Sequence, residues 1–266
     1  MSRVRLALPA AMAAFALAPC AIAQPDINNG RSVVVGGYMQ EGASGAQTGC
    51  FQCHGLKGEG DPAGAFPRLA DQSVWYLYDS LKDYASGARQ NAIMTPIAQA
   101  LSDQQMQDVA AYYAAQEDVP YPPPPKVDPM ALQRGAAISA IGAAERGVQA
   151  CINCHGPSGV GMPPSYPYLA GQYADYMILQ LNLWREGRRG GDPLGVMEVI
   201  AKQLTNEDIE AVSRYFASVR VAEVTPEEPG TDAVRPTGGP EPQARGQPAP
   251  QLGIVPAPDA PRAQGE

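Results

Sequence analysis

The sequence has 266 residues, of which 28 are glycine and 27 are proline, while only 7% are aromatic. This length allows one or two ordinary domains, and so few large side chains leave two small domains short of core material unless a bound group fills each centre. The formal net charge of −8 excludes nucleic acid as a partner, because phosphates require a basic face, and suits an acidic protein that meets partners partly through its electric field.

Residues 1–23 are predicted to be a signal peptide. Arg3 and Arg5 give a positive start, residues 6–18 form an uncharged apolar run, and Ala21-Ile22-Ala23 is a small-x-small cleavage site. The run is too short and too interrupted by proline to be a good membrane span, and no other segment is apolar enough to cross a bilayer. We therefore expect a soluble protein that is exported to the periplasm and does not span the membrane; an uncleaved anchor is the alternative.

Composition predicts the remaining boundaries. A short N-terminal lead, residues 24–36, precedes a first domain at residues 37–119. Residues 120–127 contain a run of prolines that predicts a short, stiff linker. A second domain spans residues 128–222. Residues 223–266 have almost no large apolar side chain, so we expect a disordered Pro-rich tail.

The two domains form an internal repeat. Each contains Cys-x-x-Cys-His, then Pro-x-Leu-Ala-x-Gln, then Gly-x-Arg and a methionine, in the same order and about one hundred residues apart. The second domain has three additional residues between Arg189 and Met197. Because the order of the features is unchanged, this difference is a loop insertion.

The first domain is predicted to be helical. A helix near residues 33–40 is broken by glycine, and its position is open. Apolar residues recur at helical spacing from Val74 to Leu81, and the pattern ends at Gly87, a suitable C-terminal cap. Ser102, three residues before a glutamine, begins the last helix with a capping box.

The second domain repeats this pattern. Asp128-Pro129 begins a helix with proline at its first position, and Thr205 begins the last helix. We expect the aromatic pairs at residues 112–113 and 215–216 to pack each last helix on the first helix of its domain. No stretch has the alternation of a strand, so the predicted fold class is all-α.

Cys-x-x-Cys-His is the attachment signature of haem c. The four cysteines are predicted to bind two haem groups through thioether bonds, and each histidine is predicted to be the proximal iron ligand. A redox dithiol would lie beside a βαβ pattern, which is absent, and zinc would need a fourth ligand near each motif. The residues are Cys50, Cys53 and His54 in the first domain and Cys151, Cys154 and His155 in the second.

The sixth ligand of each iron is not a histidine of this chain, because both histidines belong to the motifs. Methionine, another donor or no residue at all remain as possibilities for the sixth ligand of each iron. Met94 and Met197 lie about 40 residues after the motif histidines and are the only later methionines that match between the domains. A thioether suits haem iron, so these two residues are the predicted axial ligands.

Two further positions have two interpretations each, and a third has one. Arg89 and Arg189 are candidates to neutralise haem propionates, because a guanidinium matches a carboxylate at two points; ordinary surface arginines are the alternative. Trp184, which aligns with Tyr84, is expected to pack in the core.

Taken together, these motifs resemble class I cytochrome c, and their duplication resembles the di-haem cytochrome c4 family over about residues 37–220. The resemblance implies two tandem domains, each wrapped around one covalent haem c, that transfer single electrons in the periplasm. It also implies that the backbone carbonyls of Pro67 and Pro167 accept a hydrogen bond from the proximal imidazoles and orient them.

The sequence therefore predicts an electron carrier between respiratory partners and not an enzyme. The expected donor is a quinol-oxidising complex or a dehydrogenase, and the expected acceptor is a terminal oxidase. The alternative is the cytochrome subunit of a periplasmic dehydrogenase complex, in which another chain performs catalysis because no second cofactor motif is present here. A di-haem peroxidase is the third candidate, and it requires an open iron position that two methionine ligands would close.

Overall fold

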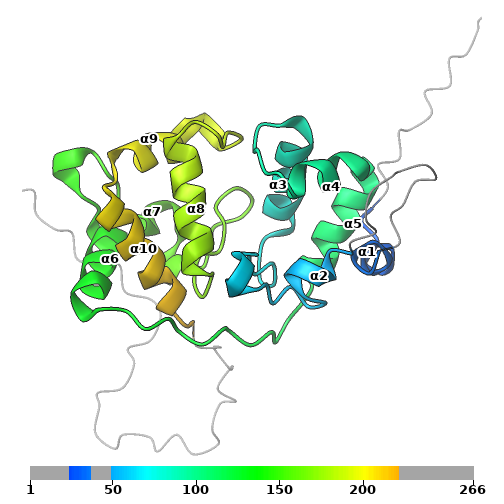
Figure 1. Ribbon diagram of the computed structural model, residues 1–266, viewed down its shortest axis with the longest axis horizontal. Coiled ribbons are helices and arrows are strands. Elements are labelled where there is room, and N and C mark those ends of the chain that lie inside the picture. Colours follow the sequence, from blue (N-terminus) through cyan, green and yellow to red (C-terminus); the bar gives the residue numbers. More distant parts are fainter. Residues whose placement is uncertain (1–23, 37–48, 222–266) are drawn as a thin grey trace, which may run out of the picture. The chain divides into compact units, whose positions relative to one another are not determined.

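The structure is a computed structural model that describes residues 24–36 and 49–221. The predicted signal peptide and Pro-rich tail lie outside the described residues. Ten α-helices and short 3-10 turns make up the described part, which contains isolated bridges but no strand (Figure 1). The all-α prediction is confirmed.

Each half of the chain has five helices in the same order, which confirms the internal repeat. In the first half these are α1 (Ile27–Val34), α2 (Phe51–His54), α3 (Val74–Ser86), α4 (Met94–Ala100) and α5 (Asp103–Ala114). In the second half they are α6 (Pro129–Ile141), α7 (Ile152–His155), α8 (Ala174–Arg185), α9 (Val196–Gln203) and α10 (Asn206–Ser218). The three-residue insertion lies beside the turn at Pro193–Gly195, before α9.

The predicted helix ends are confirmed. Helix α3 ends at Gly87, which has a φ of 82° and so adopts the left-handed conformation that glycine tolerates best. Ser102 and its capping box begin α5, Asp128 caps the N-terminus of α6, and Thr205 caps α10. These side chains accept hydrogen bonds from backbone N–H groups that have no partner within the helix.

The first helix lies earlier than predicted. We expected a glycine-broken helix near residues 33–40, but α1 spans Ile27–Val34 and begins at the cap Asp26. Val33 and Val34 are fully buried against α5, so residues 27–34 belong to the packed first domain and are not a separate lead. The sequence signal was weak because α1 is short and contains two asparagines and a glycine.

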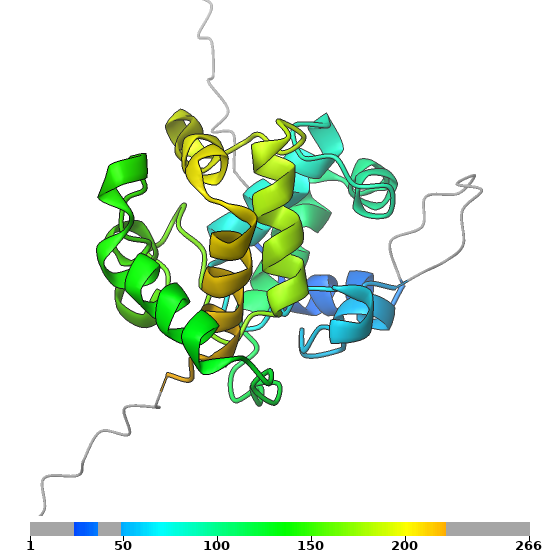
Figure 2. The ribbon, with the colours of Figure 1, turned by 60° about the vertical axis from the view of Figure 1, so that its left-hand side comes forward.

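The first and last helices of each half cross in close contact (Figure 2). A Cβ atom added to Gly30 of α1 would lie 2.1 Å from the carbonyl oxygen of Asp108 in α5. At the equivalent crossing of α6 and α10, a Cβ atom on Gly135 would lie 2.1 Å from the carbonyl oxygen of Ala211. Glycine therefore allows the two backbones to approach one another in both domains.

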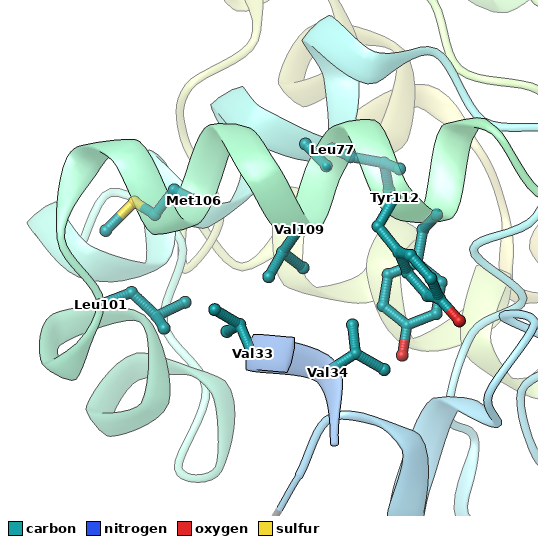
Figure 3. Close-up of a cluster of buried hydrophobic side chains, with 9 residues drawn as sticks. Val33, Val34, Leu77, Leu101, Met106, Val109 and Tyr112 are labelled. Carbon is teal, nitrogen blue, oxygen red and sulfur yellow. The ribbon is translucent and has the colours of Figure 1, made fainter. Parts of the chain in front are cut away.

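The cores follow from these crossings. In the first half, apolar side chains from α1, α3 and α5 meet around the crossing, as Figure 3 shows. The buried members labelled there are Val33, Val34, Leu77, Leu101, Met106, Val109 and Tyr112. In the second half, Ile138, Leu204, Ile209 and Val212 form the corresponding cluster. Both clusters are modest in size, which agrees with the low aromatic content of the sequence.

The Pro-rich linker has no regular secondary structure and is held near its N-terminal end. The guanidinium of Arg68 donates to the carbonyl oxygens of Val119 and Pro120 at 2.7 and 3.0 Å. The guanidinium of Arg220 donates to the carbonyl oxygen of Pro122 at 2.5 Å. Arginines from both domains thus fix a segment whose prolines have no N–H to donate.

Candidate haem sites

The two Cys-x-x-Cys-His motifs fold as the single-turn helices α2 and α7. The backbone N–H of His54 donates to the carbonyl oxygen of Cys50 at 2.9 Å, and His155 donates to Cys151 at the same distance. Residues three apart on a helical turn lie on one face, so both thiols of a motif point to the same side. None of the four cysteines forms a disulfide within the described residues.

Both motif histidines are buried and oriented by a backbone carbonyl. The Nδ1–H of His54 donates to the carbonyl oxygen of Pro67 at 3.1 Å, and that of His155 donates to Pro167 at 3.0 Å. A carbonyl only accepts, so the proton is on Nδ1 and the lone pair of Nε2 is free for a metal. Burial lowers the pKa of both imidazoles despite the opposing effect of these bonds, which favours the neutral form that ligates iron.

An aromatic ring lies edge-on to each of these imidazoles. The ring centroids of His54 and Phe66 are 6.3 Å apart at an interplanar angle of 68°, and those of His155 and Tyr166 are 6.2 Å apart at 74°. Sequence reasoning missed both rings. The repeat contained the signal, because an aromatic residue precedes the aligned proline in each half.

The last helix of the first half holds the loop that follows its motif. Tyr112 donates its hydroxyl to the carbonyl oxygen of Leu56 at 2.8 Å, and Tyr113 donates to that of Gly55 at 3.1 Å. Both members of the aromatic pair at 112–113 also belong to the buried cluster that contains Val33 and Val34 of the first helix. The prediction that this pair packs the last helix on the first helix therefore agrees with the structure.

One cavity brings the predicted site residues of the second half together, and first-half residues such as Tyr76 and Asp83 line it as well. It is lined by all of the residues singled out there from the sequence: Cys151, Cys154, His155, Pro167, Trp184, Arg189 and Met197. Met197 lies in the first turn of α9, and its backbone N–H donates to Asp192 Oδ2 at 2.7 Å. In the first half Met94 begins α4, and its N–H donates to Asn91 Oδ1 at 2.8 Å.

Arg89 and Arg189 are buried, at 2% and 5% exposure, so the interpretation as surface arginines is wrong. Arg89 donates to Tyr176 Oη and Gln180 Oε1, both at 2.7 Å. Arg189 donates to the same Gln180 oxygen at 2.8 Å and to Tyr76 Oη at 3.0 Å. Within the described residues neither guanidinium forms an ion pair with a carboxylate.

Two buried cations that share one amide oxygen create a strongly positive region. Burial alone would raise the pKa of the Tyr76 phenol, but the guanidinium groups of Arg189 and Arg89 outweigh it and lower that pKa to about 8. Burial raises the pKa of the nearby Asp83 carboxyl despite the same two cations. Asp83 lies near both cations without forming an ion pair with either, so buried positive charge is only partly balanced here and the region is suited to an anion.

A reciprocal pair of glutamines joins the two halves. The side-chain amide of Gln72 donates to the carbonyl oxygen of Tyr168 at 2.6 Å and accepts from its N–H at 3.1 Å. Gln172 makes the same two bonds with the backbone of Arg68, both at 2.9 Å. The sequence repeat contained both glutamines, but their role depends on contacts between residues about one hundred positions apart.

These residues fit haem c better than the other candidate groups. Each half supplies two thiols, a neutral imidazole with a free Nε2 and a methionine, and the buried arginines match the anionic propionates of a haem. Burial raises the pKa of the Cys50 and Cys151 thiols to about 11. Across residues 24–36 and 49–221, no group of three or more His, Cys, Asp and Glu side chains is placed to hold a metal ion.

No helix in this part of the chain is long and apolar enough to cross a membrane.

Comparison with known proteins agrees with this assignment. The family model "Cytochrome c" matches twice, at residues 39–115 and 140–220. The thiosulfate dehydrogenase electron acceptor of Stutzerimonas stutzeri is 43% identical over 189 residues, which cover 68% of this chain and 84% of that protein. The chain therefore belongs to the cytochrome c family.

Two solved structures define the relationship further. Reduced cytochrome c4 from Pseudomonas stutzeri aligns with a TM-score of 0.62 at 33% identity, over 74% of this chain and 100% of that one. The thiosulfate dehydrogenase TsdBA from Marichromatium purpuratum aligns with a TM-score of 0.64 at 33% identity, over 73% of this chain but only 40% of that longer chain. The protein is thus a cytochrome c4-like electron carrier with two covalently bound haem c groups.

Proposed function

We propose that this protein carries single electrons in the periplasm, from a dehydrogenase that oxidises thiosulfate to a further respiratory acceptor, through two haems with histidine and methionine ligands. The observation that carries the proposal is the duplicated arrangement of a buried, oriented imidazole and a methionine held at a helix start. Each haem, when bound, supplies an iron that alternates between the ferric and ferrous states.

The residues of the chain then have separate roles. Cys50, Cys53, Cys151 and Cys154 would attach the two haems, His54 and His155 would ligate iron through Nε2, and Met94 and Met197 would supply the second protein ligand of each iron. The carbonyls of Pro67 and Pro167 hold the imidazole tautomer and orientation. Arg89 and Arg189 balance propionate charge. With a histidine and a methionine on each iron, no ligand position would remain for a substrate, so the protein would transfer electrons and not catalyse a reaction of its own.

The choice of donor is supported by the similar proteins. One relative is named as the electron acceptor of thiosulfate dehydrogenase, and one similar structure is a thiosulfate dehydrogenase with a chain longer than this one. A second candidate function is that of a permanent cytochrome subunit of such an enzyme, which the likeness to part of that longer chain favours. Periplasmic location is supported by the signal-peptide pattern of residues 1–23.

The ligand assignment is tested by Met94→Ala and Met197→Ala. Each variant should convert one haem to high-spin or water-ligated iron and lower one midpoint potential, because loss of the thioether favours ferric iron, while the other haem stays unchanged. Met106→Ala, which removes a core methionine of the first half, is the control and should leave both irons low-spin. Retention of the full sulfur-to-iron charge-transfer band in both single variants would contradict the assignment.

The donor is tested by mixing the oxidised protein with a thiosulfate dehydrogenase and thiosulfate and following haem reduction. Reduction within the turnover time of the enzyme supports the proposal, and no reduction contradicts it. Size-exclusion chromatography of the same mixture separates the two candidates, because a permanent subunit co-elutes with the enzyme and a free carrier does not.

A further inference from the structure

One peptide group in the first half forms hydrogen bonds on both of its sides. It is the peptide group between Pro67 and Arg68. Its carbonyl oxygen accepts from His54 Nδ1 at 3.1 Å. Its N–H donates to the side-chain oxygen of Gln172, a residue of the second half, at 2.9 Å. A single peptide group therefore connects a motif histidine with a side chain of the other half.

The peptide group between Pro167 and Tyr168 repeats this arrangement in the opposite direction. Its carbonyl oxygen accepts from His155 Nδ1 at 3.0 Å, and its N–H donates to Gln72 Oε1 at 3.1 Å. Both glutamine side chains are buried, with 7% exposure for Gln72 and 5% for Gln172. Each motif histidine is thus connected, through one peptide group, to a glutamine of the other half.

The two hydrogen bonds of such a peptide group strengthen one another. The C–N bond of a peptide has partial double-bond character, so an acceptor on the N–H moves electron density towards the carbonyl oxygen. The oxygen then accepts more strongly from the imidazole, and the low dielectric constant of a protein interior increases the effect. A stronger bond at Nδ1 makes Nε2 more basic, and a more basic imidazole favours ferric iron.

We propose that Gln172 tunes the reduction potential of the first haem and that Gln72 tunes the potential of the second, each through the peptide group that it binds. In both cases the glutamine oxygen stabilises the ferric state and so lowers the potential. The glutamines are positioning residues, because each acts through a histidine of the other half. The inference rests on the proposed ligation of iron by His54 and His155. It does not depend on the methionine ligands or on the identity of the donor protein.

The test is Gln172→Leu in the holoprotein, with both midpoint potentials measured by spectroelectrochemistry. Loss of the acceptor should weaken the bond at His54 by about 10–30%, which corresponds to about threefold in the preference of the first haem for the ferric state. For a one-electron couple this is a rise of about 30 mV in the first midpoint potential. Gln172 lines the cavity of the second half, so a local packing effect would change the second potential and not the first. Gln72→Leu should raise the second potential.

A second readout reports the strength of the hydrogen bond itself. In the reduced, diamagnetic protein, the NMR signal of the His54 Nδ1–H proton should move upfield in Gln172→Leu, because its bond to the carbonyl is weaker. The corresponding signal of His155 should not move. The two imidazoles are distinguished by the rings that lie edge-on to them, Phe66 beside His54 and Tyr166 beside His155.

Tyr173→Phe is the matched control. The Tyr173 hydroxyl also donates from one half to the other, to the carbonyl oxygen of Glu59 at 3.1 Å, but that carbonyl belongs to neither of the two peptide groups. Its loss should leave both potentials and both proton signals unchanged. An unchanged first potential in Gln172→Leu, or equal shifts of the two haems, would overturn the proposal.

If Gln172→Leu does not take up haem, Gln172→Glu decides, because it keeps an acceptor at the same position. At a pH where the new carboxyl is ionised, it accepts more strongly than an amide, so the His54 proton should move downfield and the first potential should fall. An unchanged His54 signal would contradict the proposal. Failure of the ligand assignment has a different signature, high-spin iron in the unaltered protein, and failure of the thiosulfate dehydrogenase experiment leaves both potentials measurable.

Discussion

Substitution of Gly135 by alanine tests whether the crossing of α6 and α10 is as close as the structure has it. The new Cβ would lie 2.1 Å from the carbonyl oxygen of Ala211 and 2.7 Å from the Cβ of Tyr215, where ordinary contacts begin at 3.4 Å. Neither neighbour belongs to a flexible side-chain end, so no rotamer change relieves the clash, and the helices must separate by more than about 1 Å.

The magnitude follows from two opposing effects. Overpacking a core costs about 1–3 kcal/mol, and contact with backbone atoms places this case near the upper end. Alanine gains about 1 kcal/mol over glycine within a helix. We therefore expect Gly135→Ala to lower the free energy of unfolding of the second domain by about 2 kcal/mol. In a domain of this size, its melting temperature should fall by roughly 8–16 °C.

The assay is thermal and guanidinium unfolding of the holoprotein, followed by circular dichroism and haem absorbance. Ala137→Gly, at an exposed position of the same helix, is the control and should cost about 1 kcal/mol through helix propensity alone. Gly30→Ala should repeat the loss in the first domain, since its Cβ would meet Asp108 at the same distance. An increase in stability of about 1 kcal/mol for Gly135→Ala would mean that propensity acts unopposed, and would refute the close crossing.

Two further predictions concern polar groups that are buried or join the halves. Burial tends to raise the pKa of Asp208, but its hydrogen bonds with Thr205 and Arg134 outweigh burial and lower it. The ionised Asp208 carboxylate stabilises the folded state fully above the pKa of the unfolded chain, near ~4, and this stabilisation is lost as the pH falls through the lower pKa of the folded state. Asp208→Asn should therefore lower the free energy of unfolding by about 2 kcal/mol at pH 7 and by progressively less towards pH 3. Urea titrations across that range measure the difference, and a difference independent of pH would contradict the assignment. Gln172→Ala removes both hydrogen bonds to the backbone of Arg68 and should lower the free energy of unfolding, measured with guanidinium, by about 1–3 kcal/mol. Gln172→Glu keeps the acceptor and should have an intermediate effect. Parent-like stability of both variants would count against these bonds.

The features that sequence reasoning predicted well are those with local signals. The cap at Gly87, the capping box at Ser102 and the two haem-attachment motifs each depend on a few neighbouring residues, and the structure places them as expected. Helix α1 was placed too late because a short helix with glycine and asparagine has little propensity, and its position is set by packing on α5.

Contacts between distant residues lay beyond the sequence. Arginine is usually found on the surface, so the sequence alone does not predict that Arg89 and Arg189 are buried. Only the fold shows that both guanidinium groups donate to the same side-chain oxygen of Gln180. Likewise, an aromatic residue at position 184 predicts packing, whereas only the fold shows that the N–H of Trp184 has no hydrogen-bond partner within the described residues. Sequence periodicity reports which side is buried, and it does not report which groups face one another across the buried region.

The reciprocal glutamines have a consequence for how the two halves can change. Contacts made in both directions by equivalent residues, as Gln72 and Gln172 make them, have the symmetry of an isologous dimer. Here both halves are on one chain, so their association is intramolecular. The linker gives each half an effective concentration on the order of millimolar around the other, and this concentration does not change when the protein is diluted. A homodimer must remain compatible with itself at every interface position. A tandem chain is free of that requirement, and pairs such as Ser80 with Gln180 and Tyr84 with Trp184 have diverged where a symmetric dimer would hold two identical residues.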